Sequence, residues 1–224
     1  RPLSAAEVTQ IHGAQGTIAV TPGGGGPFTT IQSAIDAAKA GMTVVVPPGT
    51  YDEDIVMKNH VDVIGAGPGV TAIVGDPGGN DPVVAFDPGT DARLSGFRIS
   101  GGDPGNLNNN AQNVIDIEDS SATLSNLYIE NAKNSGVMID IETADIVRVV
   151  ASVIRHCGES AVQLKDLDIG SALLENLTID EIGNRNLGSG RGGGVMENDS
   201  AGRTAIRNCI FSRCYPFAIS VTGT

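Results

Sequence analysis

The stretch "ATLSNLYIE", residues 122–130, decides how the rest of the sequence is interpreted, because variants of it recur along the chain. Each copy has an apolar residue, then a small or amide residue, then another apolar residue three positions further on. The copies begin at Ala92, Ala122, Val147, Ser171 and Arg203. Strand-like repeats with a period of about 25 residues and no helix of their own are typical of a solenoid.

A second series of short alternating segments lies between these copies, from "VVAFDP" (83–88) to "AISVTG" (218–223). When coils stack through parallel strands, equivalent aliphatic residues lie side by side, so we expect Leu94 to lie beside Leu124. The amides of Asn126, Asn176 and Asn208 would stack as a hydrogen-bonded, buried ladder in one turn. The sequence therefore predicts an all-β solenoid of about seven coils.

One amphipathic helix is expected, and its role is structural. Residues 28–40 place four apolar side chains on one helical face: Phe28, Ile31, Ile35 and Ala38. Thr29 or Thr30 would cap the start of this helix, and Gly41 would end it. Because a stack of coils has an exposed apolar end, we predict that the helix covers the first coil.

Charge and composition exclude several classes of function. The 224 residues carry a formal net charge of −12, which argues against nucleic acid and against an anionic membrane surface as partners. No apolar segment is long enough to span a bilayer. Cys157, Cys209 and Cys214 lack the spacing of a metal site and are expected to be buried free thiols.

Residues 28–75, with a G-T-Y-x-E motif at Gly49, Thr50, Tyr51 and Glu53, resemble the opening of the pectin-lyase-like superfamily of right-handed parallel β-helices. The likeness is to pectinesterases and related uncharacterised β-helix proteins. It implies a single-stranded right-handed parallel β-helix in a secreted, carbohydrate-associated protein with a polysaccharide as partner. Pectinesterase motifs such as Q-D-T-L and polygalacturonase motifs such as G-H-G are absent, which argues against both activities. Polysaccharide lyases of this fold, which share mainly acidic calcium ligands and a basic residue as general base, remain open.

The candidate site lies on the second strand series. Alternation in "VIDIEDS" (114–120) and "VMIDIET" (137–143) points four carboxylates outward on neighbouring coils: Asp116, Glu118, Asp140 and Glu142. Carboxylates at strand spacing repel one another, so they either bind a hard cation or have raised pKa values. Oxygen ligands suit Ca²⁺, and the four residues are therefore predicted to form a calcium site.

The next coil adds Gln163 and Lys165 on the outer side, and Glu197 and Asp199 would continue the acidic row. Insertions that begin at Gly101 and Gly183 precede acidic strands and would wall a groove over the Asp116/Asp140 strands. The groove would bind or cleave an acidic polysaccharide through the residues named here: Lys165 and Asp140 as the catalytic pair, and Arg185, Arg191 and Gln163 as substrate contacts. Acidic outward rows also serve solubility alone, so a non-catalytic stalk or adhesin segment is the alternative function.

Two further features concern the ends of the chain. Residues 1–12, "RPLSAAEVTQIH", resemble the tail of laminin-G-like domains, so we assign 1–26 to an N-terminal extension and linker and 27–224 to the β-helix. The last residues, "FAISVTGT", have the pattern of a strand without a cap. An uncapped coil exposes core and edge, which predicts either further coils or end-to-end self-association.

Overall fold

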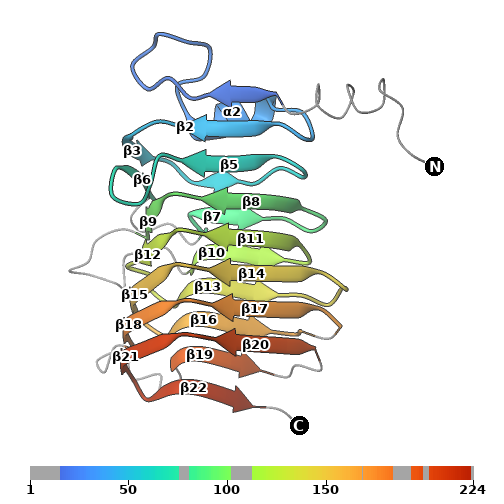
Figure 1. Cartoon of the computed structure of the whole chain (residues 1–224), viewed down its shortest axis with the longest axis vertical. Helices are drawn as coiled ribbons and strands as arrows, with labels where there is room; N and C mark the ends of the chain where they lie inside the picture. Colours follow the sequence, from blue (N-terminus) through green and yellow to red (C-terminus); the bar gives the residue numbers. More distant parts are fainter. Residues whose placement is uncertain are drawn as a thin grey trace.

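The computed structural model describes residues 16–75, 81–101, 113–167, 169–183, 193–198 and 202–222. Its strands wind into coils that stack along one axis and form three parallel sheets (Figure 1). Sheet A has eight strands, and sheets B and C have seven each, which confirms the predicted parallel β-helix of about seven coils.

The three sheets take one strand from nearly every coil. Sheet A consists of β1 (Thr17–Ala19), β2 (Thr43–Val46), β5 (Asp62–Gly65), β8 (Asp91–Ser95), β11 (Ser121–Ser125), β14 (Ile146–Val150), β17 (Ser171–Glu175) and β20 (Arg203–Arg207). Sheet B consists of β3 (Gly49–Asp52), β6 (Thr71–Val74), β9 (Arg98–Ser100), β12 (Tyr128–Glu130), β15 (Val153–Cys157), β18 (Thr178–Ile182) and β21 (Ile210–Cys214). Sheet C consists of β4 (Ile55–Val56), β7 (Val84–Phe86), β10 (Asn113–Glu118), β13 (Ser135–Asp140), β16 (Ser160–Lys165), β19 (Gly193–Asn198) and β22 (Phe217–Thr222). Strand β1 lies within the segment assigned to the linker, and it pairs in parallel with β2.

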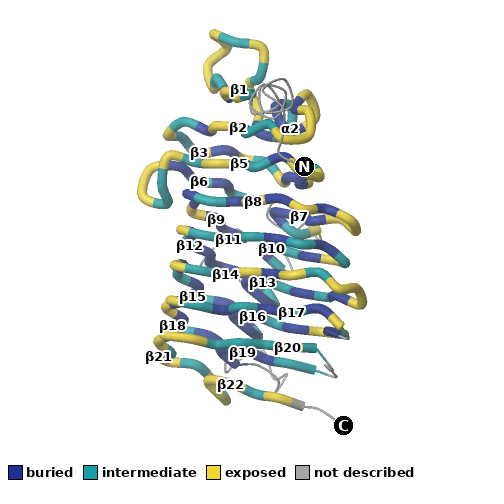
Figure 2. The backbone as a smooth tube through the Cα atoms, turned by 45° about the vertical axis from the view of Figure 1, so that its right-hand side comes forward, coloured by how far each residue is buried: buried dark blue, intermediate teal, exposed yellow. Residues whose placement is uncertain are grey.

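The core consists of rows of aliphatic side chains that continue from coil to coil. The expected pairing of Leu94 with Leu124 is confirmed, and the row continues through Val149 and Leu174. All four side chains are fully buried, and Figure 2 shows buried positions recurring along the strands. Such continuous burial of apolar area is the main stabilising contribution in a stack of coils.

The turn that follows each strand of sheet A has the same backbone conformation at the predicted small or amide position. Gly96, Asn126, Ala151, Asn176 and Asn208 all have positive φ, between 48° and 79°, and follow the strands of sheet A. The three asparagines are exposed, so their expected burial is wrong. The expected amide hydrogen bond is confirmed for one pair, because Asn208 Nδ2 donates to Asn176 Oδ1 at 2.5 Å. Asparagine and glycine are favoured here because they tolerate the left-handed region better than other residues do.

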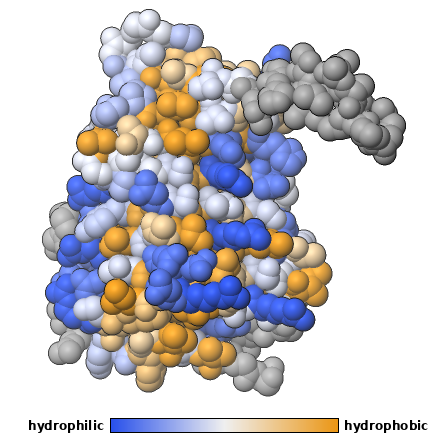
Figure 3. Space-filling view, in the orientation of Figure 1, coloured by the Kyte–Doolittle hydropathy of each residue, from blue (hydrophilic) through white to orange (hydrophobic). Residues whose placement is uncertain are grey.

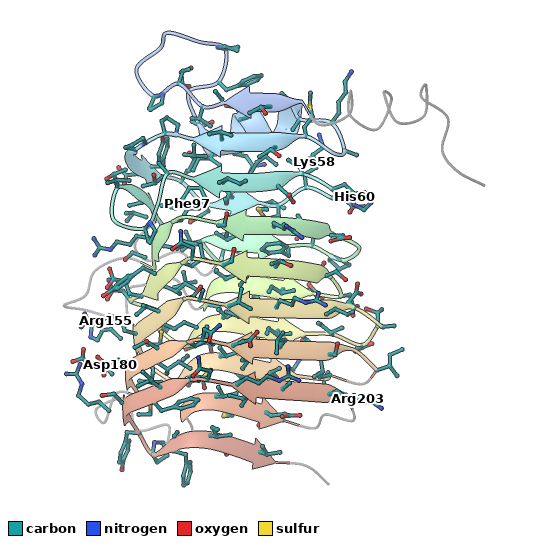
Figure 4. The ribbon with its side chains drawn as sticks, in the orientation of Figure 1. Lys58, His60, Phe97, Arg155, Asp180 and Arg203 are labelled. Atoms are coloured by element: carbon teal, nitrogen blue, oxygen red, sulfur yellow. The ribbon has the colours of Figure 1, made fainter. Side chains whose placement is uncertain are left out.

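The helix covers the first coil as predicted, but it is shorter. Helix α2 (Ile31–Ala37) buries Ile31, Ala34 and Ile35, and the N-cap is Thr30, whose side chain accepts a hydrogen bond from the Ser33 N–H. The expected end at Gly41 is wrong, because Ala38 is already extended. The Lys58 ammonium, on the coil below, donates to the carbonyls of Asp36 and Ala38 (Figure 4).

The opposite end of the stack exposes apolar side chains. Five residues of the last coil are between 45% and 66% exposed: Ile210, Tyr215, Phe217, Ile219 and Val221. Their side of the molecule is largely hydrophobic in Figure 3. Ile219 and Val221 have the register of the inward rows of sheet C. They are exposed because β22 is the edge strand of that sheet among the described residues.

Candidate functional site

The outer side of sheet C carries two rows of side chains that run across the coils. One row contains Asp116, Met138, Gln163 and Met196, and the other contains Glu118, Asp140, Lys165 and Asn198. The predicted outward parity is confirmed, because the intervening Ile115, Ile117, Val137 and Ile139 are buried. In the register of β10 and β13, Asp140 lies beside Glu118, and Met138 lies beside Asp116.

Glu142 lies outside this arrangement. Strand β13 ends at Asp140, and the exposed Glu142 follows in the turn, where its backbone N–H donates to Asp119 Oδ1 at 2.8 Å. The predicted stacking of all four carboxylates is therefore wrong. Alternation fixes the side of a sheet on which a residue lies, but a slide of two residues preserves that side and changes the neighbours.

Lys165 and Asp140 lie together as predicted, and they form an ion pair. Lys165 Nζ is 2.8 Å from Asp140 Oδ2 and 3.1 Å from Asp166 Oδ2. Hydrogen bonds to these two carboxylates raise the pKa of Lys165 above its ordinary value. A general base must lose its proton near the working pH, so this ion pair opposes the role of base that the sequence indicates for Lys165.

A cavity of about 440 Å³ opens on sheet C next to Asp116. Half of its lining residues are carboxylates, and the others are apolar. The carboxylates are Asp54, Asp81, Asp87, Asp116 and Glu118. Asn113 Nδ2 lies 3.4 Å from Asp116 Oδ2. Burial, with smaller effects from Glu118 and Asp140, raises the pKa of Asp116. The sequence indicated Asp116 and Glu118, but not Asp54 or Asp87, which join them only when the coils stack.

The remaining predicted residues have different outcomes. Gln163 accepts a hydrogen bond from Ser135 Oγ at 3.1 Å, two residues away from Lys165 on β16. Arg185, Arg191 and Asp199 lie outside the described residues. Glu197, expected to point outward, instead pairs with Leu164 and Val221 in an inward row, near the open end of the core. Its outward placement is therefore wrong.

Within the described residues, no group of three or more His, Cys, Asp or Glu side chains is arranged to hold a metal ion. None of the helices in that part of the chain combines the length and apolar character that crossing a bilayer requires. All three cysteines are free thiols; Cys157 is buried, and burial raises its pKa to about 12.

Sequence reasoning missed a second cavity, of about 640 Å³, on the outer side of sheet B. Its charged and aromatic lining comes from Arg98, Tyr128, Glu130 and Arg155, which lie on the adjacent strands β9, β12 and β15. Only the alternation of polar residues in these strands signals the cluster in the sequence, and that alternation is common to any exposed strand.

The repeats and the sheets extend over nearly the whole chain, and so does a match to one protein family. The family described as "Protein of unknown function (DUF1565)" matches residues 14–215. The chain belongs to this family. Among curated proteins, none matches the chain.

Solved structures share the fold of this family member at low sequence identity. A pectin methylesterase mutant in complex with a hexasaccharide is 14% identical with a TM-score of 0.56, and the match covers 83% of this chain and 65% of that one. ORF18 of Geobacillus virus E2 is 17% identical with a TM-score of 0.59, over 92% and 50% of the two chains. Alginate lyase from Paenibacillus sp. str. FPU-7 is 14% identical with a TM-score of 0.52, over 85% and 75%. The chain thus spans about two thirds of the length of the pectin methylesterase, and the right-handed parallel β-helix is the shared feature.

Proposed function

We propose that this chain binds a polysaccharide on the outer side of sheet C, at the cavity next to Asp116. The observation that carries the proposal is the concentration of five carboxylates around this one concave site. Ionised carboxylates accept hydrogen bonds from several donors at once, and sugar hydroxyl groups supply such donors. The fold agrees with this proposal, because the pectin methylesterase and the alginate lyase that share it are named for polysaccharides.

The charge of the cavity sets the class of polymer. A neutral polysaccharide would bind directly, whereas an acidic one would need a cation to approach five carboxylates. We propose Ca²⁺ for that role, with Asp116 and Glu118 as ligands and with polymer carboxylates and water completing the shell. Asp140 is held by Lys165, and Glu142 lies apart, so they are weaker candidates. An extracellular location belongs to the same proposal, since long polysaccharides occur outside cells.

Binding, rather than cleavage, is the part that the geometry supports. A lyase needs a base with access to a sugar proton, but Lys165 is paired with Asp140 and Asp166 and its pKa is raised. Production of unsaturated sugar ends, followed by ultraviolet absorbance, would test this point directly. The alternative function is a rigid stalk, and the uninterrupted stacking of three sheets favours it.

Calorimetric titration with neutral and acidic polysaccharides, with and without Ca²⁺, tests the proposal. Replacing Asp116 with Asn should weaken binding by about ten-fold to about one-hundred-fold, because one charged hydrogen bond is worth about 1.5–3 kcal/mol. Since a cation binds only the ionised carboxylate, Ca²⁺ binding should strengthen as pH rises through the raised pKa of Asp116. The matched control is Asp91→Asn, which removes an exposed carboxylate on sheet A.

Unchanged binding in Asp116→Asn would refute the sheet C site. If no polysaccharide binds with or without Ca²⁺, the stalk becomes the better interpretation.

A further inference from the structure

The second cavity, on sheet B, has a chemistry different from that of the acidic one. It lies between the turn after β5, which contributes Pro68 and Val70, and the outer side chains of β9, β12 and β15. Arg155 projects outward from β15 at the sheet B side of the molecule (Figure 4). Two guanidinium groups and one carboxylate are the charged groups of the lining, and the Glu181 carboxylate, outside the lining, pairs with Arg155. The cavity therefore presents guanidinium donors to a ligand on a chain of net charge −12.

The carboxylate of the lining, that of Glu130, is turned away from solvent. Arg98 Nε donates to Glu130 Oε1 at 2.6 Å, and the Glu130 side chain is only 9% exposed. The Arg98 side chain is 52% exposed, so its guanidinium keeps a face toward the cavity. Because a guanidinium has five donors in a planar fork, one carboxylate oxygen leaves most of them for a second anion.

Arg155 contributes the second cation. Its Nη1 donates to Tyr128 Oη at 3.1 Å, and its Nη2 donates to Glu181 Oε2 at 2.8 Å. Its Nε is buried and has no hydrogen-bond partner within the described part of the chain. Because this Nε has almost no accessible surface, a ligand would reach the Arg155 guanidinium through the remaining N–H groups of Nη1 and Nη2.

The side chains between and around the cations suit a sugar ring. Tyr128 lies beside Arg98 in the register of β12 and β9, and its hydroxyl is positioned by Arg155. The 55%-exposed Val70, with Pro68, forms an apolar wall on the other side. Ligand sites typically combine such apolar and aromatic walls with a few fixed polar groups.

We propose that this cavity binds an oligouronate, with sugar carboxylates paired to Arg98 and Arg155 and a ring packed between Tyr128 and the Pro68–Val70 wall. Arg98 and Arg155 lie two coils apart, about 10 Å at the strand spacing, so one oligosaccharide would span both. The site goes beyond the sheet C proposal and is independent of it. An acidic sugar binds here without a bridging cation, because guanidinium and carboxylate groups pair directly.

The test is calorimetric titration of the full chain with trigalacturonate in EDTA, which removes divalent cations. The comparison ligand is the fully methyl-esterified trisaccharide, which keeps the sugar rings and loses the charges. We expect trigalacturonate to bind and the ester not to bind. Arg98→Gln and Arg155→Gln should each weaken binding about ten-fold, since each removes one charge-assisted contact.

Matched controls separate this site from general charge and from sheet C. Arg148→Gln removes the same charge from an exposed position on β14 of sheet A, and it should leave binding unchanged. Asp116→Asn should also leave it unchanged. Thermal unfolding of each variant verifies the fold, and Tyr128→Phe, which keeps the ring, is expected to retain binding within a few-fold.

Several results would overturn the proposal: no binding of trigalacturonate, equal binding of the ester, or full affinity in both arginine variants. If Arg148→Gln lowers the affinity for trigalacturonate as much as Arg98→Gln does, the arginines act only through the net charge of the chain. That result would also overturn the proposal. Binding that disappears in Asp116→Asn alone would assign the sugar to sheet C instead.

Discussion

At the scale of single residues, the turn that follows sheet A shows how one backbone conformation selects different side chains. Asn126, Asn176 and Asn208 have positive φ and are exposed, so an amide fits. Gly96 has a φ of 79°, and a Cβ there would lie 2.4 Å from the Gly65 carbonyl oxygen. Glycine is therefore required at position 96 for two reasons: its φ is positive, and the Gly65 backbone leaves no room for a Cβ.

This difference predicts opposite effects of the same new side chain. Ala151→Asn should be neutral or stabilising by a few tenths of a kcal/mol, because Ala151 is exposed at a φ of 48°, which asparagine tolerates. Gly96→Asn should lower the free energy of unfolding by about 1–3 kcal/mol, because the added atoms meet the Gly65 backbone. Urea unfolding of both variants measures this, and equal effects would contradict the explanation.

At the scale of elements, the helix exists because the coils hold it at both ends. Seven residues are too few for a stable isolated helix. The Glu53 carboxylate accepts from the Ile31 N–H at 2.8 Å and from the Gln32 N–H at 3.0 Å, while Lys58 satisfies carbonyls at the other end. The G-T-Y-x-E motif is thus structural here, since Tyr51 is buried and its hydroxyl donates to the Pro47 carbonyl.

Removing the Glu53 carboxylate should weaken the attachment of helix α2 to the first coil. Glu53→Ala is expected to lower the free energy of unfolding by about 2 kcal/mol, because two helix N–H groups lose a charged acceptor. Amide hydrogen exchange in residues 31–37 should rise in the same variant. Asp52→Ala, which removes the exposed neighbouring carboxylate, is the matched control. Similar losses in both variants would show that Glu53 does not hold the helix.

At the scale of the whole molecule, the two ends of the stack differ. Helix α2 covers the first coil (Figure 1). The last coil exposes apolar side chains and strand edges. Exposed parallel edges that adjoin open core favour pairing with another chain. End-to-end association through this coil therefore stays the prediction for the 224-residue chain.

Sedimentation velocity over a range of concentrations measures that association. Ile219→Lys places a charge in the exposed inward row and should shift the chain toward monomer, because burial of an unpaired ammonium is unfavourable. Ser220→Lys adds the same charge on the outward row of the same strand and should have a smaller effect. A chain that remains monomeric at every concentration would contradict the prediction.

Period-2 alternation and recurring turn residues are local signals, so the coil, the inward rows and the helix-covered first coil could be predicted from the amino-acid sequence. It also placed Asp116, Glu118, Asp140 and Lys165 on the correct outer side. Which of these residues are neighbours could not be predicted, because coil-to-coil register depends on turn lengths and not on alternation. For the same reason, the tertiary structure alone paired Asp140 with Glu118 and Lys165 and moved Glu197 into an inward row. The sheet B cavity likewise forms only when β9, β12 and β15 lie side by side.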